Sequence, residues 1–101
     1  MIHVTELEME EILGILKQHF ENGHVLAFGS RYKGTHKPYS DLDLAFVKNE
    51  GTGLMASEWG RLKEAFEESD LTYRVDVVDY WGSLENFRAI IDKGCVKIYE
   101  S

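Results

Sequence analysis

The stretch that decides the fold is "LAFGSRYKGTHKPYSDLDLAFV", Leu26–Val47, in which two apolar segments flank a basic loop. The apolar segments predict two strands, His24–Phe28 and Leu42–Val47. In the second segment aspartates and leucines alternate, and residues two apart on a strand face the same side. The leucines are therefore expected to point into the core, while Asp41 and Asp43 project together on the other face. Buried carboxylates are costly unless something pairs with them, so the pattern suggests that the two acids bind a ligand.

Hydrophobic periodicity elsewhere predicts three longer helices and a third strand. The helices are expected over Thr5–Glu21, Leu54–Glu68 and Ser83–Lys93, and the strand over Tyr73–Val78. Thr5 and Glu8 match a capping box at the start of the first helix. In the last helix, Ser83 is a candidate cap, and the expected buried stripe comprises Leu84, Phe87, Ile90 and Ile91. The tail "CVKIYE" predicts a short edge strand, and a short helical turn from Arg31 is a further option.

The lengths of the connections predict the topology of the sheet. Only residues 29–41 separate the first two strands, and this loop contains Pro38 and no helical stripe. Because a parallel crossover usually needs a helix, these two strands are expected to be antiparallel. The second and third strands are joined through a predicted helix, which suits a right-handed parallel crossover. The predicted fold class is α/β (α+β): a small mixed sheet flanked by about three helices, in one domain over residues 1–101.

The composition narrows the classes of function. The chain has 101 residues, with 11 basic and 18 acidic side chains and a net charge of −7. This balance argues against direct binding of duplex nucleic acid, which needs a basic surface, and it is compatible with a metal-dependent site or a basic protein partner. No apolar run approaches the roughly 20 residues that span a bilayer, so no membrane association is expected. Cys95 is the only cysteine, which fits a reducing cytoplasm.

The aspartates form the first candidate site. Asp41 and Asp43 should have Cα atoms roughly 6.5–7 Å apart on one strand face, and such a pair can hold one metal ion or bridge two. In "YRVDVVDY", Asp76 lies in the middle of the third strand and can join them if the strands are neighbours. Asp79 has the opposite parity and lies at the strand end, where a turn or capping role is the simpler interpretation. Mg²⁺ prefers such carboxylate oxygens together with phosphate oxygens.

The junction between the first strand and the loop is a candidate phosphate site. At Gly29 the backbone can approach a ligand closely, and backbone N–H groups with the Ser30 hydroxyl suit a phosphate. The basic residues Arg31 and Lys33 follow at once, and Ser40 immediately precedes the aspartates. A plain turn with solvated basic side chains is the alternative. The Gly-Ser pair gains weight because it lies ten residues ahead of Asp-x-Asp.

These motifs together resemble a known pattern. "GS", ten residues, "DLDL" and a later "VDVV" are similar to the signature of the polymerase-β-type nucleotidyltransferase superfamily, and "FGSRYKGTHKPYSDLDLAFV" resembles its MNT-type minimal members. The resemblance covers about residues 24–79. It implies that Gly29, Ser30, Arg31, Lys33 and Ser40 bind nucleotide, and that Asp41, Asp43 and Asp76 are catalytic and bind metal. Tyr32 departs from the small residue that is frequent at its position.

The resemblance also implies an activity and a partner. MNT-type proteins pair with HEPN-domain proteins as antitoxins. The implied reaction is transfer of AMP from ATP to a tyrosine of a HEPN-type toxin, with two Mg²⁺ ions as cofactors. The implied location is the cytoplasm. Two alternatives remain: a weakly catalytic or non-catalytic nucleotide-binding module that neutralises its partner by direct complex formation, and transfer to a small molecule. Among the aromatic residues, Trp59 and Phe87 are expected in the core, whereas Tyr80 and Trp81 suit the core and a partner interface about equally.

Overall fold

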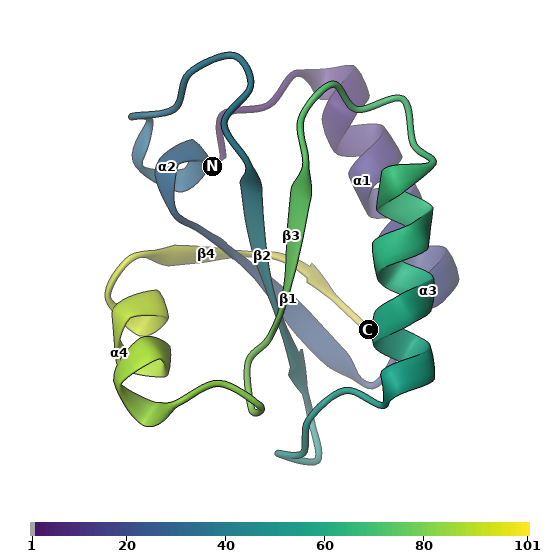
Figure 1. The fold of residues 1–101 in the computed structure, drawn as a ribbon, viewed down its shortest axis with the longest axis vertical. Coiled ribbons are helices and arrows are strands. Elements are labelled where there is room, and N and C mark those ends of the chain that lie inside the picture. The colour runs from purple at the N-terminus through teal and green to yellow at the C-terminus, as the bar shows by residue number, and fades with distance from the viewer. Residues whose placement is uncertain (1) are drawn as a thin grey trace.

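A four-stranded mixed sheet runs through the centre of the computed structural model, which describes residues 2–101 (Figure 1). In chain order the elements are α1 (Glu6–His19), β1 (Gly23–Phe28), α2 (Ser30–Lys33), β2 (Leu42–Lys48), α3 (Ala56–Glu67), β3 (Val75–Asp79), α4 (Glu85–Lys93) and β4 (Cys95–Glu100). The ends of the predicted helices and strands lie within two residues of these bounds. The short α2 corresponds to the optional helical turn of the basic loop, so the described part of the chain has four helices instead of about three.

The strand order is β3-β2-β1-β4. Strand β1 is antiparallel to both β2 and β4, and β2 is parallel to β3. Both predicted pairings are therefore confirmed, as is the edge strand formed by the tail. The loop between β1 and β2 reverses the chain direction, whereas α3 carries the chain back so that β3 can run alongside β2 in the same direction.

Helices α1 and α3 cover one face of the sheet and enclose the larger core (Figure 1). Helix α1 begins with the predicted capping box: the Glu8 N–H donates to the Thr5 hydroxyl at 3.1 Å, and the Thr5 N–H donates to the Glu8 carboxylate at 2.8 Å. Two otherwise unpaired backbone donors are thereby satisfied. The fully buried side chains of this core include Ile12, Leu16, Val25, Leu42, Leu44, Phe46 and Leu62.

The opposite face is covered mainly by α4, which lies across the sheet from α1 and α3 (Figure 1). Ile91 packs there against Phe28 and Ala45. The predicted buried stripe of this helix is otherwise wrong, because Leu84 is 77% exposed, Ile90 is 62% exposed, and Phe87 is also exposed. Periodicity placed these side chains on one side of the helix, but only a narrow line of that side meets the sheet.

Two further expectations, for Ser83 and Trp59, are corrected. Ser83 does not cap α4: Leu84 is at the N-cap position, and the Ser83 hydroxyl donates to the Asp79 carbonyl at 2.8 Å. Trp59 is partly exposed instead of lying in the core, and its indole N–H donates to the Val77 carbonyl at 3.1 Å. This bond engages an outward-facing carbonyl of the edge strand β3, where an open edge would invite pairing with another chain.

Within residues 2–101, every helix is too short or too polar to cross a bilayer.

Candidate functional site

The register of the sheet brings the predicted acids together. Asp43 on β2 lies opposite Asp76 on β3, and on its other side it lies opposite Phe28, the last residue of β1. Neighbouring side chains on β2 and β3, Leu42, Leu44, Val75 and Val77, belong to the core beneath α1 and α3. Since side chains alternate along a strand, Asp43 and Asp76 project on the opposite face, which they share with α4.

Gly29 lies directly against Asp43 of this acidic pair. Its backbone has φ 78° and ψ −157°, a region that essentially only glycine occupies. A Cβ built on Gly29 would meet the Asp43 carboxylate far inside the 3.0 Å limit that real Cβ atoms respect. The predicted phosphate cradle and the predicted metal ligand are therefore adjacent, and the absence of a side chain at Gly29 keeps them so. Ser30 follows as the first residue of α2.

The charge on Asp43 is disfavoured in this environment. Burial, followed by repulsion from Asp76 and Asp41, raises the pKa of Asp43 to about 6 from its usual 3.8, while the guanidinium of Arg74 opposes this rise. Like charges held side by side gain most from a bound cation. Perturbed carboxylates in such a cluster are typical of functional sites.

Arg74 is a member of the cluster that sequence reasoning missed. Its guanidinium donates two hydrogen bonds to Asp41 Oδ2, at 2.7 Å and 3.2 Å. The interaction with Asp41 raises the pKa of Arg74 above its usual value. The signal was present in "YRVD", because Arg74 is two residues before Asp76 and a strand places both on one face.

Arg31, predicted to bind nucleotide, is enclosed within the protein. Only 4% of it is exposed, and its guanidinium donates to the carbonyls of Ser40 at 2.9 Å, Pro38 at 2.9 Å and His3 at 3.1 Å. It also lies 3.8 Å from the centre of the Tyr73 ring. The structure therefore places Arg31 beneath the loop that leads to Asp41, and it does not bring this side chain to the aspartates.

This burial predicts a large effect on stability. We expect Arg31→Ala to lower the free energy of unfolding by about 3 kcal/mol, because the carbonyls of His3, Pro38 and Ser40 lose a charged donor that is itself buried. Arg31→Lys should rescue little, since one ammonium group cannot replace the planar guanidinium. Lys33→Ala, which removes an exposed cation from the same turn, should leave the free energy of unfolding nearly unchanged. Urea unfolding of the three variants checks this, and equal stabilities of Arg31→Ala and Lys33→Ala would contradict it.

Comparison with known proteins identifies the family. Residues 9–99 match the nucleotidyltransferase domain family. The chain belongs to this family. It is also 48% identical over 99 residues to a curated Haemophilus influenzae protein named "Probable protein adenylyltransferase MntA", an alignment that covers 98% of this chain and 85% of the relative. The predicted nucleotidyltransferase resemblance is thereby confirmed.

Solved structures show the same fold. A crystal structure of a toxin–antitoxin with AMP-PNP superposes with a TM-score of 0.75 at 20% identity, covering 92% of this chain and 73% of that one. The toxin–antitoxin MntA-HepT superposes with a TM-score of 0.68 at 16% identity, covering 96% of this chain and 74% of the other. The mixed α/β architecture of this nucleotidyltransferase is therefore that of its structural neighbours.

Lys33 and Ser40, the other two predicted nucleotide-binding residues, have different surroundings: Lys33 borders a cavity, whereas Ser40 is hydrogen-bonded within its own loop. Lys33 is exposed and lines a cavity of about 380 Å³ together with Phe28, Gly29, Ile90, Lys93 and Gly94. Lys33 thus borders the same cavity as Gly29, in the candidate phosphate site. Ser40 is engaged within its own loop, where its hydroxyl accepts a hydrogen bond from the Lys37 N–H at 2.8 Å. Asp79 was expected to have a turn or capping role at the strand end, and its carboxylate instead accepts a hydrogen bond from the Leu54 N–H, 25 residues away, at 3.1 Å.

The acids of the nucleotidyltransferase fit a divalent cation by their chemistry. Asp43 and Asp76 offer hard oxygen donors from neighbouring strands, and repulsion among the carboxylates would be relieved by a cation. As they stand, no three His, Cys, Asp or Glu side chains within residues 2–101 form a ready metal cluster. Asp41 instead meets the guanidinium of Arg74.

Proposed function

We propose that this nucleotidyltransferase transfers AMP from ATP to a tyrosine hydroxyl of a HEPN-type toxin and thereby acts as its antitoxin, with Mg²⁺ bound by Asp41, Asp43 and Asp76. The observation that carries the proposal is the register that aligns Asp43 with Asp76 beside Gly29. The named adenylyltransferase relative and the toxin–antitoxin structure with AMP-PNP support the choice of nucleotide and of a protein acceptor.

The proposed reaction is an in-line displacement at the α-phosphorus of ATP. The bond from the α-phosphorus to the bridging oxygen breaks, a bond to the acceptor oxygen forms, and pyrophosphate leaves. Backbone N–H groups after Gly29 hold phosphate oxygens, and the exposed carboxylate of Asp76 accepts the proton of the attacking hydroxyl. When bound, Mg²⁺ supplies charge neutralisation and orientation of the triphosphate.

The acceptor protein must reach the face of the sheet that carries the acids. That face is thinly covered, and α4 presents the exposed side chains of Leu84, Phe87 and Ile90 there. Ile90 also lines the cavity that extends to Gly29, so this apolar surface is continuous with the candidate phosphate site. A partner seated on α4 would therefore bury apolar area while it presents a hydroxyl to Asp76. This is the role that we assign to the exposed face of α4.

A pair of surface variants tests the docking face. We expect Ile90→Ser to weaken binding of the toxin partner roughly tenfold, which is typical for truncating an apolar residue near the centre of an interface. Leu7→Ser is the matched control, because Leu7 is 77% exposed on α1, on the opposite face of the sheet. Calorimetric titration of each variant with the partner gives the comparison. Equal losses for both variants, or no loss for Ile90→Ser, would contradict docking on α4.

The transfer itself is tested with labelled nucleotide. The purified chain is incubated with Mg²⁺, the HEPN-type protein encoded beside it, and ATP labelled on either the α- or the γ-phosphate. Label should reach a partner tyrosine from the α-position only, and modified partner should lose its toxicity. If neither label is transferred, while Asp41→Asn with Asp43→Asn still neutralises the partner, the chain acts by complex formation and the catalytic proposal fails.

A further inference from the structure

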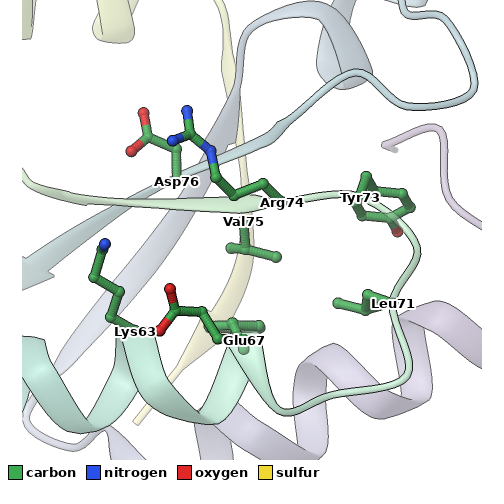
Figure 2. Close-up of a pocket in the computed structure, with 8 residues that line it drawn as sticks. Lys63, Glu67, Leu71, Tyr73, Arg74, Val75 and Asp76 are labelled. Atoms are coloured by element: carbon green, nitrogen blue, oxygen red, sulfur yellow. The ribbon is translucent and has the colours of Figure 1, made fainter.

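Four charged side chains form a square on the exposed face of β2 and β3. Asp43 lies opposite Asp76. Two residues earlier in each segment, Asp41 accepts hydrogen bonds from Arg74. The Leu42 N–H donates to the Arg74 carbonyl at 2.9 Å, which fixes the two segments side by side. Three corners of the square are acidic and one is basic. Figure 2 shows Arg74, immediately before β3, and Asp76, on β3, projecting to the same side, while Val75 between them points toward α3.

The guanidinium of Arg74 contacts the Asp41 carboxylate, which is one of the proposed metal ligands. Both of its hydrogen bonds end on one oxygen, Asp41 Oδ2. Asp43 and Asp76 form the next pair along the two strands. A single side chain of this protein thus provides part of the compensation that a divalent cation would provide.

The ion pair between Arg74 and Asp41 is exposed to solvent and is therefore easily broken. The side chain of Arg74 is 73% exposed and that of Asp41 is 37% exposed. Exposed ion pairs contribute little to stability, so a divalent cation can displace the guanidinium at small cost. Arg74 also borders a cavity of about 190 Å³ between β3 and α3, with Lys63 and Glu67 on its far side (Figure 2). The long side chain therefore has open space beside it.

We propose that Arg74 is a resident counter-cation: it holds Asp41 in the metal-free protein, competes with the divalent cation for that carboxylate, and so sets the metal affinity of the site. The inference rests on the proposed metal ligands of the nucleotidyltransferase. Arg74 acts through Asp41 and is a positioning residue. One consequence of the proposal is that the chain binds metal weakly when it is alone. A second source of binding energy, the triphosphate, is then needed to displace the guanidinium.

Titration of the full chain with Mn²⁺ alone, followed by electron paramagnetic resonance of the free ion, tests the proposal. We expect Arg74→Gln to bind Mn²⁺ about two- to fivefold more tightly, corresponding to removal of an exposed ion pair. Arg74→Lys, which keeps the charge, should stay close to the unmodified protein. Arg61→Gln is the control, since it makes the same change of net charge on α3, away from the square.

A double-mutant cycle separates this role from general electrostatics. In an Asp41→Asn background, Arg74→Gln should no longer change Mn²⁺ affinity, because the carboxylate for which it competes is absent. Equal or weaker Mn²⁺ binding by Arg74→Gln, or an effect that persists without Asp41, would overturn the proposal. The titration uses neither ATP nor a partner, so it can succeed or fail independently of AMP transfer. Melting curves in EDTA establish that each variant is folded.

Discussion

Asp43→Asn is expected to lower the rate of AMP transfer by at least about a hundredfold, the scale seen when one electrostatic contact to a transition state is removed. The same change should raise the melting temperature of the metal-free protein. Burial and the charges of Asp76 and Asp41 disfavour the ionised Asp43 carboxylate, and the neutral amide of similar shape removes that repulsion. Loss of activity with a gain in stability is the combination expected of an acid retained for function.

Transfer of α-labelled phosphate and thermal melting in EDTA measure the two effects. Asp70→Asn is the control, because Asp70 is an exposed aspartate outside the cluster. It should change neither quantity appreciably. An Asp43→Asn variant that transfers label at the unmodified rate would remove Asp43 from the catalytic set. A variant that melts at a lower temperature in EDTA would show that the carboxylate stabilises the fold.

Gly29→Ala is expected to disrupt both stability and nucleotide binding. The backbone conformation of Gly29 is essentially restricted to glycine, so a side chain there costs about 1–3 kcal/mol even without a neighbour. The new Cβ would also collide with the Asp43 carboxylate, which must then leave its present position. We therefore expect a lower melting temperature together with at least tenfold weaker ATP binding.

Gly51→Ala separates the two causes. Gly51 also has a positive φ, of 75°, but a Cβ there has nothing within 4 Å. It should show backbone strain alone, with a smaller loss of stability and unchanged ATP binding. Melting curves and titration with ATP provide the comparison. If the two alanine variants behave alike, the contact between Gly29 and Asp43 has no role in binding the nucleotide.

The sheet and the acids were predictable because strand alternation is a local property. The pattern "DLDL" places Leu42 and Leu44 on one face wherever the strand lies, and the lengths of the connections predict the relative directions of β1, β2 and β3. Side-chain alternation and strand direction depend on sequence spacing and chain geometry, both of which are visible in a single sequence. The position of Asp76 beside Asp43 was predicted only on the condition that β3 pairs with β2, and the structure shows this pairing.

The surroundings of Arg31 and α4 were not predictable in this way. Arg31 follows the Gly-Ser pair in a basic loop, where a phosphate or solvent contact is the natural prediction. Its burial arises only because the loop folds back and presents backbone carbonyls to it. Periodicity likewise showed which side chains of α4 share a side, but not that the sheet meets Ile91 and leaves Ile90 exposed. Burial depends on what else packs nearby.

Arg31 supports the basic loop through the backbone of the loop and not through its side chains. Most side chains of the loop can therefore be substituted without loss of this support. Its guanidinium binds the backbone oxygens of Pro38 and Ser40, which every residue type provides, and Tyr39 between them is 78% exposed. Substitutions at such a position keep the path of the chain to Asp41. The rim of the catalytic face can therefore acquire new preferences for an acceptor while the chemistry beneath it stays the same.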